Sequence, residues 1–415
     1  MAQKTSVDAG SVEDTTLSAP RRSLWRNRDF MLLWSGQLVS SVGTRVTMLA
    51  FPLLVLAVTH SPAQAGLIAA VRSVPYLLVM LPAGALVDHW NRKRVMIACD
   101  IGRALVLGSI PLALALGNLT LLQLYLVSLV EGTLFSIFNI AETACLPEVV
   151  EKAQLTDAVA QNTIIDSASG MAGPTLGGIL YSIGSAIPFL SDAITYVISF
   201  LSLFFVRTRF RQEREARPIR LWHDIREGLA WLWGHPLLRF IALLNGGLYA
   251  PVIGYSLILI VLAQGQHASP VVIGLIFAGG GVGSIIGAFL VGPLKRRFTF
   301  NQLMVWGVWA WSLTWLLLAI APNPLVLGIA TALSFIVVPI YTSVHFGFRL
   351  ETIPDHLQGR VNSVFRLLTF GSEPLGMAVT GFLLQAIGPI PTILVLFIPQ
   401  GVLSVVTMFS RHFRG

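Results

Sequence analysis

The stretch Gly84-Ala-Leu-Val-Asp88-His-Trp-Asn91-Arg92-Lys93-Arg94 is a short, charge-dense segment between two long apolar runs. Its glycine allows two backbones to approach closely, its aspartate can cap a helix or pair with a cation, and its asparagine suits a tight turn. Arginine and lysine next to membrane spans concentrate on the cytoplasmic side. The stretch therefore predicts a cytoplasmic turn that joins two membrane-spanning helices.

The composition of the whole chain also indicates a membrane protein. Of its 415 residues, 54% are hydrophobic and 12% are charged, and the mean hydropathy is +0.74. A soluble domain does not carry this much apolar sequence. The net charge of +8 is spread over short gaps between apolar runs rather than gathered in one patch. This pattern argues against nucleic acid as a partner and indicates determinants of membrane topology.

Runs of about 18 or more apolar residues are long enough to cross a bilayer. The sequence contains twelve, at 30–58, 63–87, 95–116, 120–146, 158–182, 186–206, 237–263, 270–292, 302–321, 325–350, 361–386 and 390–409. Basic gaps alternate with gaps that carry no charge, and both ends of the chain fall on the basic side. We therefore predict an all-α protein of the plasma membrane with twelve transmembrane helices and both termini in the cytoplasm.

The chain divides into two halves of six spans each. The predicted parts are a disordered tail (1–28), a first six-helix bundle (29–206), a cytoplasmic linker (207–236), a second six-helix bundle (237–410) and a short tail (411–415). Between Leu221 and Trp233 the linker mixes aromatic and charged residues at helical spacing, which predicts an amphipathic helix on the inner leaflet. The motif Ser-Pro-x-x-x-Gly-Leu-Ile occurs at 61–68 and again at 269–276, so the bundles are expected to be pseudo-symmetric.

Two motifs carry a resemblance to a known family. The spacing Gly-x-Leu-x-Asp-x-x-x-Arg-Lys, from Gly84 to Lys93, resembles the signature between helices 2 and 3 of the major facilitator superfamily, although His89 and Asn91 replace its Arg and Gly. The motif Gly173-Pro174-Thr-Leu-Gly177-Gly178 resembles that of the antiporter branches of this superfamily. The resemblance implies alternating access to a substrate site between two bundles, with helix 5 packing tightly to close the outer side.

A weaker resemblance points to one branch of the superfamily. The segments 146–162 and 226–229 resemble the drug:proton antiporter branch that contains macrolide-efflux proteins and the enterobactin exporter.

Ionisable residues inside apolar spans are costly and commonly mark a transport pathway. Those deepest in their spans are Arg45, Arg72, Glu131 and Glu373. A carboxylate that meets an arginine in only one of two conformations can bind and release a proton. We therefore predict that Glu131 or Glu373 exchanges protons and that Arg45 and Arg72 approach Glu131; a permanent Arg45–Glu131 ion pair is the alternative. Two residues complete the sets of proton-coupling candidates and cavity charge partners, respectively: Asp166 and Arg366.

The inner gate is predicted to lie at the cytoplasmic turn. Its candidate residues are Gly84, Asp88, Arg92, Lys93, Asp100 and Arg103, and the last two can pair because they are three apart on one helix face. The family often supplies a cation from helix 4 to the aspartate, but residues 119–151 contain no lysine or arginine.

Other features are given less specific roles. Trp306, Trp309, Trp311 and Trp315 are assigned to lipid-facing or interfacial anchoring rather than to a ligand cage. No Walker motif, catalytic constellation or metal-ligand spacing is present in the sequence, so we predict neither an enzyme nor a cofactor or metal site.

These observations predict a monomeric secondary transporter that exports amphipathic small molecules of the drug, macrolide or siderophore type, driven by inward proton flow. Proton- or sodium-coupled uptake of a metabolite is one alternative, and the helix 5 motif argues against it. A non-transporting membrane receptor or scaffold is another, but such a protein has no need for buried charges of both signs. The substrate, its charge, the coupling ion and the partner of Asp88 stay open.

Overall fold

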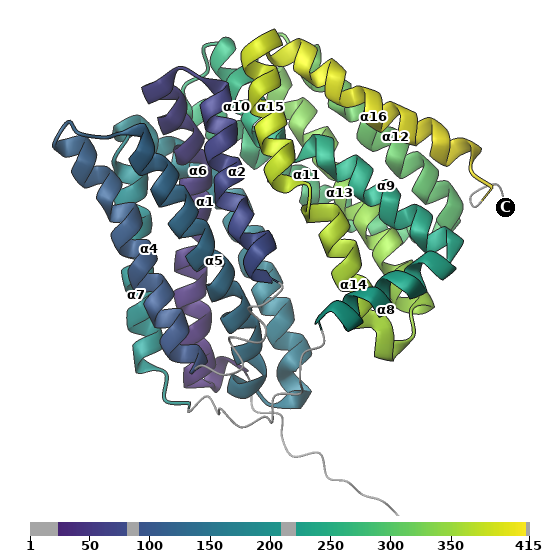
Figure 1. Cartoon of the computed structure of the whole chain (residues 1–415), viewed down its shortest axis with the longest axis horizontal. Helices are drawn as coiled ribbons and strands as arrows, with labels where there is room; N and C mark the ends of the chain where they lie inside the picture. Colours follow the sequence, from purple (N-terminus) through teal and green to yellow (C-terminus); the bar gives the residue numbers. More distant parts are fainter. Residues whose placement is uncertain (1–23, 81–90, 209–220, 412–415) are drawn as a thin grey trace, which may run out of the picture.

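The computed structural model describes residues 24–80, 91–208 and 221–411, and it is helical almost throughout (Figure 1). Gly84 and Asp88 lie outside these ranges. The first group of helices comprises α1 (Arg28–Thr59), α2 (Pro62–Met80), α4 (Arg92–Ala115), α5 (Leu121–Val149), α6 (Leu155–Ile183) and α7 (Ile187–Phe205). The second comprises α9 (Pro236–Val252), α10 (Tyr255–Gly265), α11 (Pro270–Arg297), α12 (Phe300–Ala319), α13 (Pro324–Thr352), α14 (Asp355–Phe370), α15 (Glu373–Ile387) and α16 (Pro389–Phe409). Helix α8 (Leu221–Gly234) follows the linker, where the amphipathic helix is predicted.

The all-α prediction is confirmed. Within the described residues, ten helical segments are long and apolar enough to cross a membrane, counting α9 with α10 and α14 with α15 as one segment each. The chain is therefore a multi-pass membrane protein. Several of its helices begin where a side chain caps the first turn: Asn91, for example, accepts a hydrogen bond from the Arg94 amide at 3.1 Å. Asn91 has a φ of −68°, so it acts here as a helix cap and not as a left-handed turn residue.

Two predicted spans are broken rather than continuous. The run 237–263 is interrupted between α9 and α10 at Ile253 and Gly254, and the run 361–386 is interrupted between α14 and α15 at Gly371 and Ser372. Glycine weakens a helix interior, and Pro374 in the first turn of α15 cannot donate a hydrogen bond back to the preceding turn. The apolar pattern continues through both breaks, so hydropathy alone does not reveal them.

The two groups of helices lean together at one end and diverge toward the end where α8 lies (Figure 1). They pack against each other mainly through α2 with α15 and α6 with α11. Gly66 lies against Gly381 in the first contact, and Gly178 lies against the Pro270 backbone in the second. Small residues allow this close approach of backbones. Gly274, the repeat counterpart of Gly66, lies against α6, so equivalent glycines occupy equivalent contacts.

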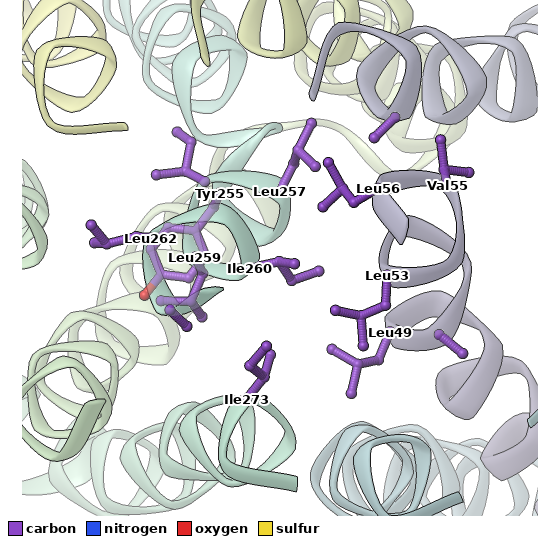
Figure 2. Close-up of a cluster of buried hydrophobic side chains, with 14 of the residues drawn as sticks. Leu49, Leu53, Val55, Leu56, Tyr255, Leu257, Leu259, Ile260, Leu262 and Ile273 are labelled. Carbon is purple, nitrogen blue, oxygen red and sulfur yellow. The ribbon is translucent and has the colours of Figure 1, made fainter. Parts of the chain in front are cut away.

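An apolar cluster seals the end where the two groups meet. Figure 2 shows Leu49, Leu53 and Leu56 of α1 across from Tyr255–Leu262 of α10 and Ile273 of α11. Leu53, Ile260 and Ile273 are each at most 2% exposed. This end lies near the beginnings of α2 and α11, beside the gaps that carry no charge.

Candidate functional site

A cavity of about 280 Å³ lies between the two groups of helices. Its wall is mostly apolar and includes Phe51 of α1, Phe135 of α5 and Leu257 of α10. Three ionisable side chains reach it: Arg72 from α2, Glu131 from α5 and Glu373 from α15. The cavity thus combines an apolar surface with charges of both signs, and both groups of helices contribute a carboxylate.

Glu131 is held by two arginines. Its Oε2 accepts a hydrogen bond from Arg72 Nε at 2.6 Å, and its Oε1 accepts from Arg72 Nη2 at 3.3 Å and from Arg103 Nη2 at 3.1 Å. The side chains of Glu131 and Arg103 are 5% and 3% exposed, whereas that of Arg72 is 31% exposed. Arg103 therefore binds Glu131 from inside the bundle, and Arg72 binds it from the cavity side.

Aromatic rings and a hydroxyl fix Arg103 in place. Its guanidinium lies 4.0 Å from the centre of the Tyr196 ring and 5.2 Å from that of Phe135, and its Nη2 donates to Thr44 Oγ1 at 3.3 Å. Arginine over an aromatic face is stabilised by the ring quadrupole, more strongly where water is excluded. The pair of Glu131 with Arg103 is thus a built-in part of the first bundle.

Glu373 has a different environment. It is the first residue of α15, directly after the break that follows α14, where the positive end of the helix dipole favours a carboxylate. Arg72 is near enough to interact with it electrostatically. Within the described residues Glu373 has no hydrogen bond or ion pair. It is therefore the cavity carboxylate that is available to a ligand or a proton.

Arg45 does not approach Glu131, contrary to the prediction. It lies on the side of α1 that packs against α6, beside Gly173, and its Nη1 is 4.0 Å from the Met48 sulfur. The α1 residues that line the cavity include Thr47 and Met48 instead. Helical rotation between neighbouring positions separates these directions, and the depth of a residue in its span does not report it.

Arg103 is also misplaced in the prediction of the inner gate. It pairs with Glu131 instead of Asp100, which is fully buried in the first bundle. Arg103 is the twelfth of the 24 residues of α4, so its depth is the signal that could have identified it as a cavity partner.

The basic pair of the cytoplasmic turn joins helices of one bundle. Arg92 forms an ion pair with Glu148 and donates to the Ala144 carbonyl at 2.8 Å. Lys93 Nζ donates to the carbonyls of Phe204 and Val206 at 3.0 and 2.6 Å. These contacts tie the start of α4 to the ends of α5 and α7. The predicted Gly84 and Asp88 contributions to the gate lie outside the described residues.

The last two predicted charges lie apart from Glu131. Asp166 on α6 is exposed and is not among the residues that line the cavity. Arg366 on α14 donates from Nη2 to the Tyr76 hydroxyl of α2 at 2.6 Å. Because Tyr76 lines the cavity, this hydrogen bond bridges the two groups of helices.

Replacing Tyr76 with phenylalanine removes this bridge and little else. Hydrogen bonds to charged groups contribute about 1.5–3 kcal/mol, less where water competes, so we expect a shift of about fivefold or more away from this conformation. Disulfide trapping between cysteines placed at the facing ends of α2 and α14 measures it. An unchanged trapping rate contradicts the role of the bridge.

The motif in α6 is a packing surface. The helix continues through Pro174, and its glycines lie against α1 and α11: Gly173 against Arg45, Gly177 against Val46 and Gly178 against Pro270. A larger side chain at any of these positions meets neighbouring atoms of α1 or α11.

Comparison with known proteins identifies the family. Residues 19–410 match the family described as transmembrane secretion effector, MFS_3. The chain belongs to this branch of the major facilitator superfamily. Its relatives include the multidrug efflux pump Tap of Mycolicibacterium fortuitum, 26% identical over 92% of this chain and 96% of the relative. The MFS-type transporter YfiS of Bacillus subtilis is 30% identical over 88% and 89%, and the enterobactin exporter EntS of Salmonella typhimurium is 26% identical over 87% of each chain.

Solved structures show the same fold. The nucleoside transporter NupG superimposes with a TM-score of 0.74 at 14% identity, covering 92% of this chain and 100% of NupG. A bacterial homologue of the iron transporter ferroportin has a TM-score of 0.75 in its inward-facing state, at 17% identity, covering 95% of this chain and 100% of that one. Its outward-facing state has a TM-score of 0.60 at 18% identity, covering 92% and 98%. The family, the relatives and the fold are those of transporters.

Proposed function

We propose that this transporter has twelve spans and exports amphipathic small molecules from the cytoplasm in exchange for protons. Twelve spans result if α9 with α10 and α14 with α15 each cross the membrane once, and if α2 and α6 cross it as well. The relatives named for multidrug efflux and for enterobactin export support the direction of transport. The apolar cavity with its three charged side chains suits a substrate that has both apolar and polar parts.

The proposed orientation places α8 at the inner leaflet of the plasma membrane and both termini in the cytoplasm. Helix α8 is linked to α14 by the ion pair between Glu227 and Arg360, at 2.5 Å. The basic gaps and both ends of the chain then face the cytoplasm, as the charge rule for membrane proteins requires. Since the cavity is enclosed by one chain, a monomer suffices.

In this orientation the structure is open toward the cytoplasm. The α2–α15 and α6–α11 contacts and the apolar cluster close the opposite end. The higher TM-score with the inward-facing ferroportin homologue than with the outward-facing state supports this conformation. Transport then requires these two contacts to open while the ends near α8 close.

The observation that carries the proton proposal is the position of Glu373. This carboxylate stands in the central cavity at the start of a half-helix, without a fixed partner, whereas Glu131 is held by Arg72 and Arg103. A substrate entering from the cytoplasm then displaces the proton of Glu373, and the outward-open state takes up the next one. Glu131 keeps Arg72 in place, and the exposed Asp166 has no part in this scheme.

Replacing Glu373 with glutamine is expected to abolish proton exchange while substrate still binds, because the amide keeps the shape but cannot ionise. The measurement uses purified protein in liposomes with an internal pH-sensitive dye and a panel of lipophilic cations, macrolides and catecholate siderophores. We expect substrate-evoked proton movement to fall about 100-fold, which corresponds to about 2.7 kcal/mol.

Glu351→Gln, at an exposed position near the end of α13, is the matched control and should transport normally. Proton exchange that survives in Glu373→Gln overturns the assignment. Transport that follows sodium instead favours a sodium-coupled carrier, and binding without any transport favours a receptor.

A further inference from the structure

A second cavity, of about 310 Å³, lies within the second group of helices, between α9, α10, α11, α12 and α13. Half of its twelve lining residues are aromatic: Tyr249, Tyr255, Phe277, Trp311, Trp315 and Phe335. None of the twelve carries a charge. Trp311 and Trp315 are 8% and 2% exposed, so they do not serve as the lipid-facing anchors expected from the sequence, although Trp306 is 51% exposed.

The aromatic side chains form a continuous wall around this cavity. Tyr255 lies 5.7 Å from Trp315 and 5.6 Å from Phe335 between ring centres, and Tyr249 lies 5.5 Å from Trp311. The rings are tilted or edge-to-face, an arrangement that aromatic groups favour and into which a further ring can pack. The space is comparable to the smaller ligand pockets of proteins. Its shape and chemistry suit an uncharged, planar aromatic group.

Two hydroxyls at the wall are available to a ligand. Serine and threonine in these helices commonly donate to the carbonyl four residues earlier, as Ser334 does to Ala330 at 2.9 Å and Thr314 does to Ala310 at 2.8 Å. For Ser256 that carbonyl belongs to Val252, on the other side of the α9–α10 break. Within the described residues neither Ser256 nor Tyr249 makes a side-chain hydrogen bond. The helix break therefore leaves polar groups free beside an apolar chamber.

Ser256 lines this cavity and the central cavity as well. The aromatic chamber therefore adjoins the space that contains Arg72, Glu131 and Glu373. One molecule can place an ionisable group in the central cavity and a ring system in the chamber. The discontinuous helix forms the boundary between the two compartments, a position where transporters place ligand contacts.

We propose that the chamber binds the planar aromatic part of an amphipathic substrate whose ionisable group lies in the central cavity, with Ser256 and Tyr249 hydrogen-bonding the polar edge of the ring system. This inference rests on the proposed function and narrows its substrate class to molecules with an aromatic end. A ring system adds about 0.5–1.5 kcal/mol per aromatic contact beyond its buried area. Aromatic substrates therefore bind more tightly than aliphatic ones of the same charge.

The test compares two cationic probes on the purified full-length transporter in nanodiscs: ethidium, which is planar and aromatic, and decyltrimethylammonium, which is aliphatic. Ser334→Leu fills the chamber, and Phe335→Ala removes part of its wall. We expect both changes to weaken ethidium binding at least about 10-fold, or about 1.4 kcal/mol, and to leave decyltrimethylammonium binding within about twofold. Trp306→Leu, on the exposed face of α12, should change neither.

Equal losses for both probes, or no loss for either, overturn the chamber as an aromatic subsite. Wild-type protein that binds decyltrimethylammonium but not ethidium overturns it as well and leaves the proposed export intact. A selective loss of ethidium binding together with undiminished proton exchange in Glu373→Gln supports the chamber and removes only the assignment of the proton site. Failure of the wild type to bind either probe contradicts both the chamber and the substrate class.

Discussion

Replacing Glu131 with glutamine is expected to abolish transport and to destabilise the protein at the same time. The carboxylate holds Arg72 at 2.6 Å and Arg103 at 3.1 Å. Without it, the Arg103 guanidinium stays in a site that is 3% exposed, with Tyr196 and Phe135 as neighbours but no counter-ion. Leaving one member of a buried pair uncompensated costs about 3–5 kcal/mol. Arg72 also loses its fixed position in the cavity.

Heating of the purified protein in detergent, followed by the fraction that remains monodisperse, measures the destabilisation. The same substitution at Glu227 is a suitable control, because Glu227 pairs with Arg360 where both side chains are 37% exposed. Exposed pairs contribute about 0–1 kcal/mol, so Glu227→Gln should unfold close to the wild-type temperature. Equal thermal shifts in the two variants argue against a buried charge centre, and Glu131→Gln with full proton-driven transport removes Glu131 from the mechanism.

Replacing Gly178 with valine is expected to stop the transport cycle by preventing closure of one end. A Cβ atom at this position of α6 meets the carbonyl of Pro270 in α11, and backbone atoms cannot move aside as a flexible side chain can. Overpacking costs about 1–3 kcal/mol, which shifts a two-state equilibrium by about 5- to 150-fold. The conformation described here then loses population to one in which α6 and α11 are apart.

A single cysteine at Ser73, which lines the cavity, reports this shift. Both native cysteines are buried, so labelling by a membrane-impermeant maleimide should be specific. We expect labelling from the side opposite α8 to increase in Gly178→Val. Gly170→Val, on the same helix with no atom within 4 Å of an added Cβ, keeps the wild-type pattern. A Gly178→Val protein that transports normally would show that this contact does not limit the cycle.

Much of the architecture follows from local features that a sequence displays. The helices begin and end within a few residues of the apolar runs, because burial in a membrane demands long apolar segments whose backbone is hydrogen-bonded internally. The repeated Ser-Pro-x-x-x-Gly motif predicts equivalent roles for Gly66 and Gly274, and both lie at contacts between the two groups of helices. The family signature in α6 predicts tight packing for Gly173, Gly177 and Gly178, and each lies against a neighbouring helix.

The predicted charge centre was only partly correct. Depth in a span selects Glu131, Arg72 and Glu373, all of which line the cavity. It does not determine which helix faces which, so Arg45 was paired with Glu131 although it lies against α6, and Arg103 was assigned to the gate although it binds Glu131. Pairing depends on rotation about each helix axis, which packing against neighbouring helices sets.

The sequence by itself determined the membrane class, the helical content, the alternation of basic and uncharged gaps, and the small residues at the contacts, because each depends on composition or spacing along one segment. Only the tertiary structure decided the two arginines on Glu131, the unpaired position of Glu373 and the aromatic chamber. Each of these joins residues from helices distant in the sequence, or depends on a helix break that hydropathy does not record. Physically, the bilayer selects each helix separately, whereas the packing of helices against one another selects the partners of every buried charge.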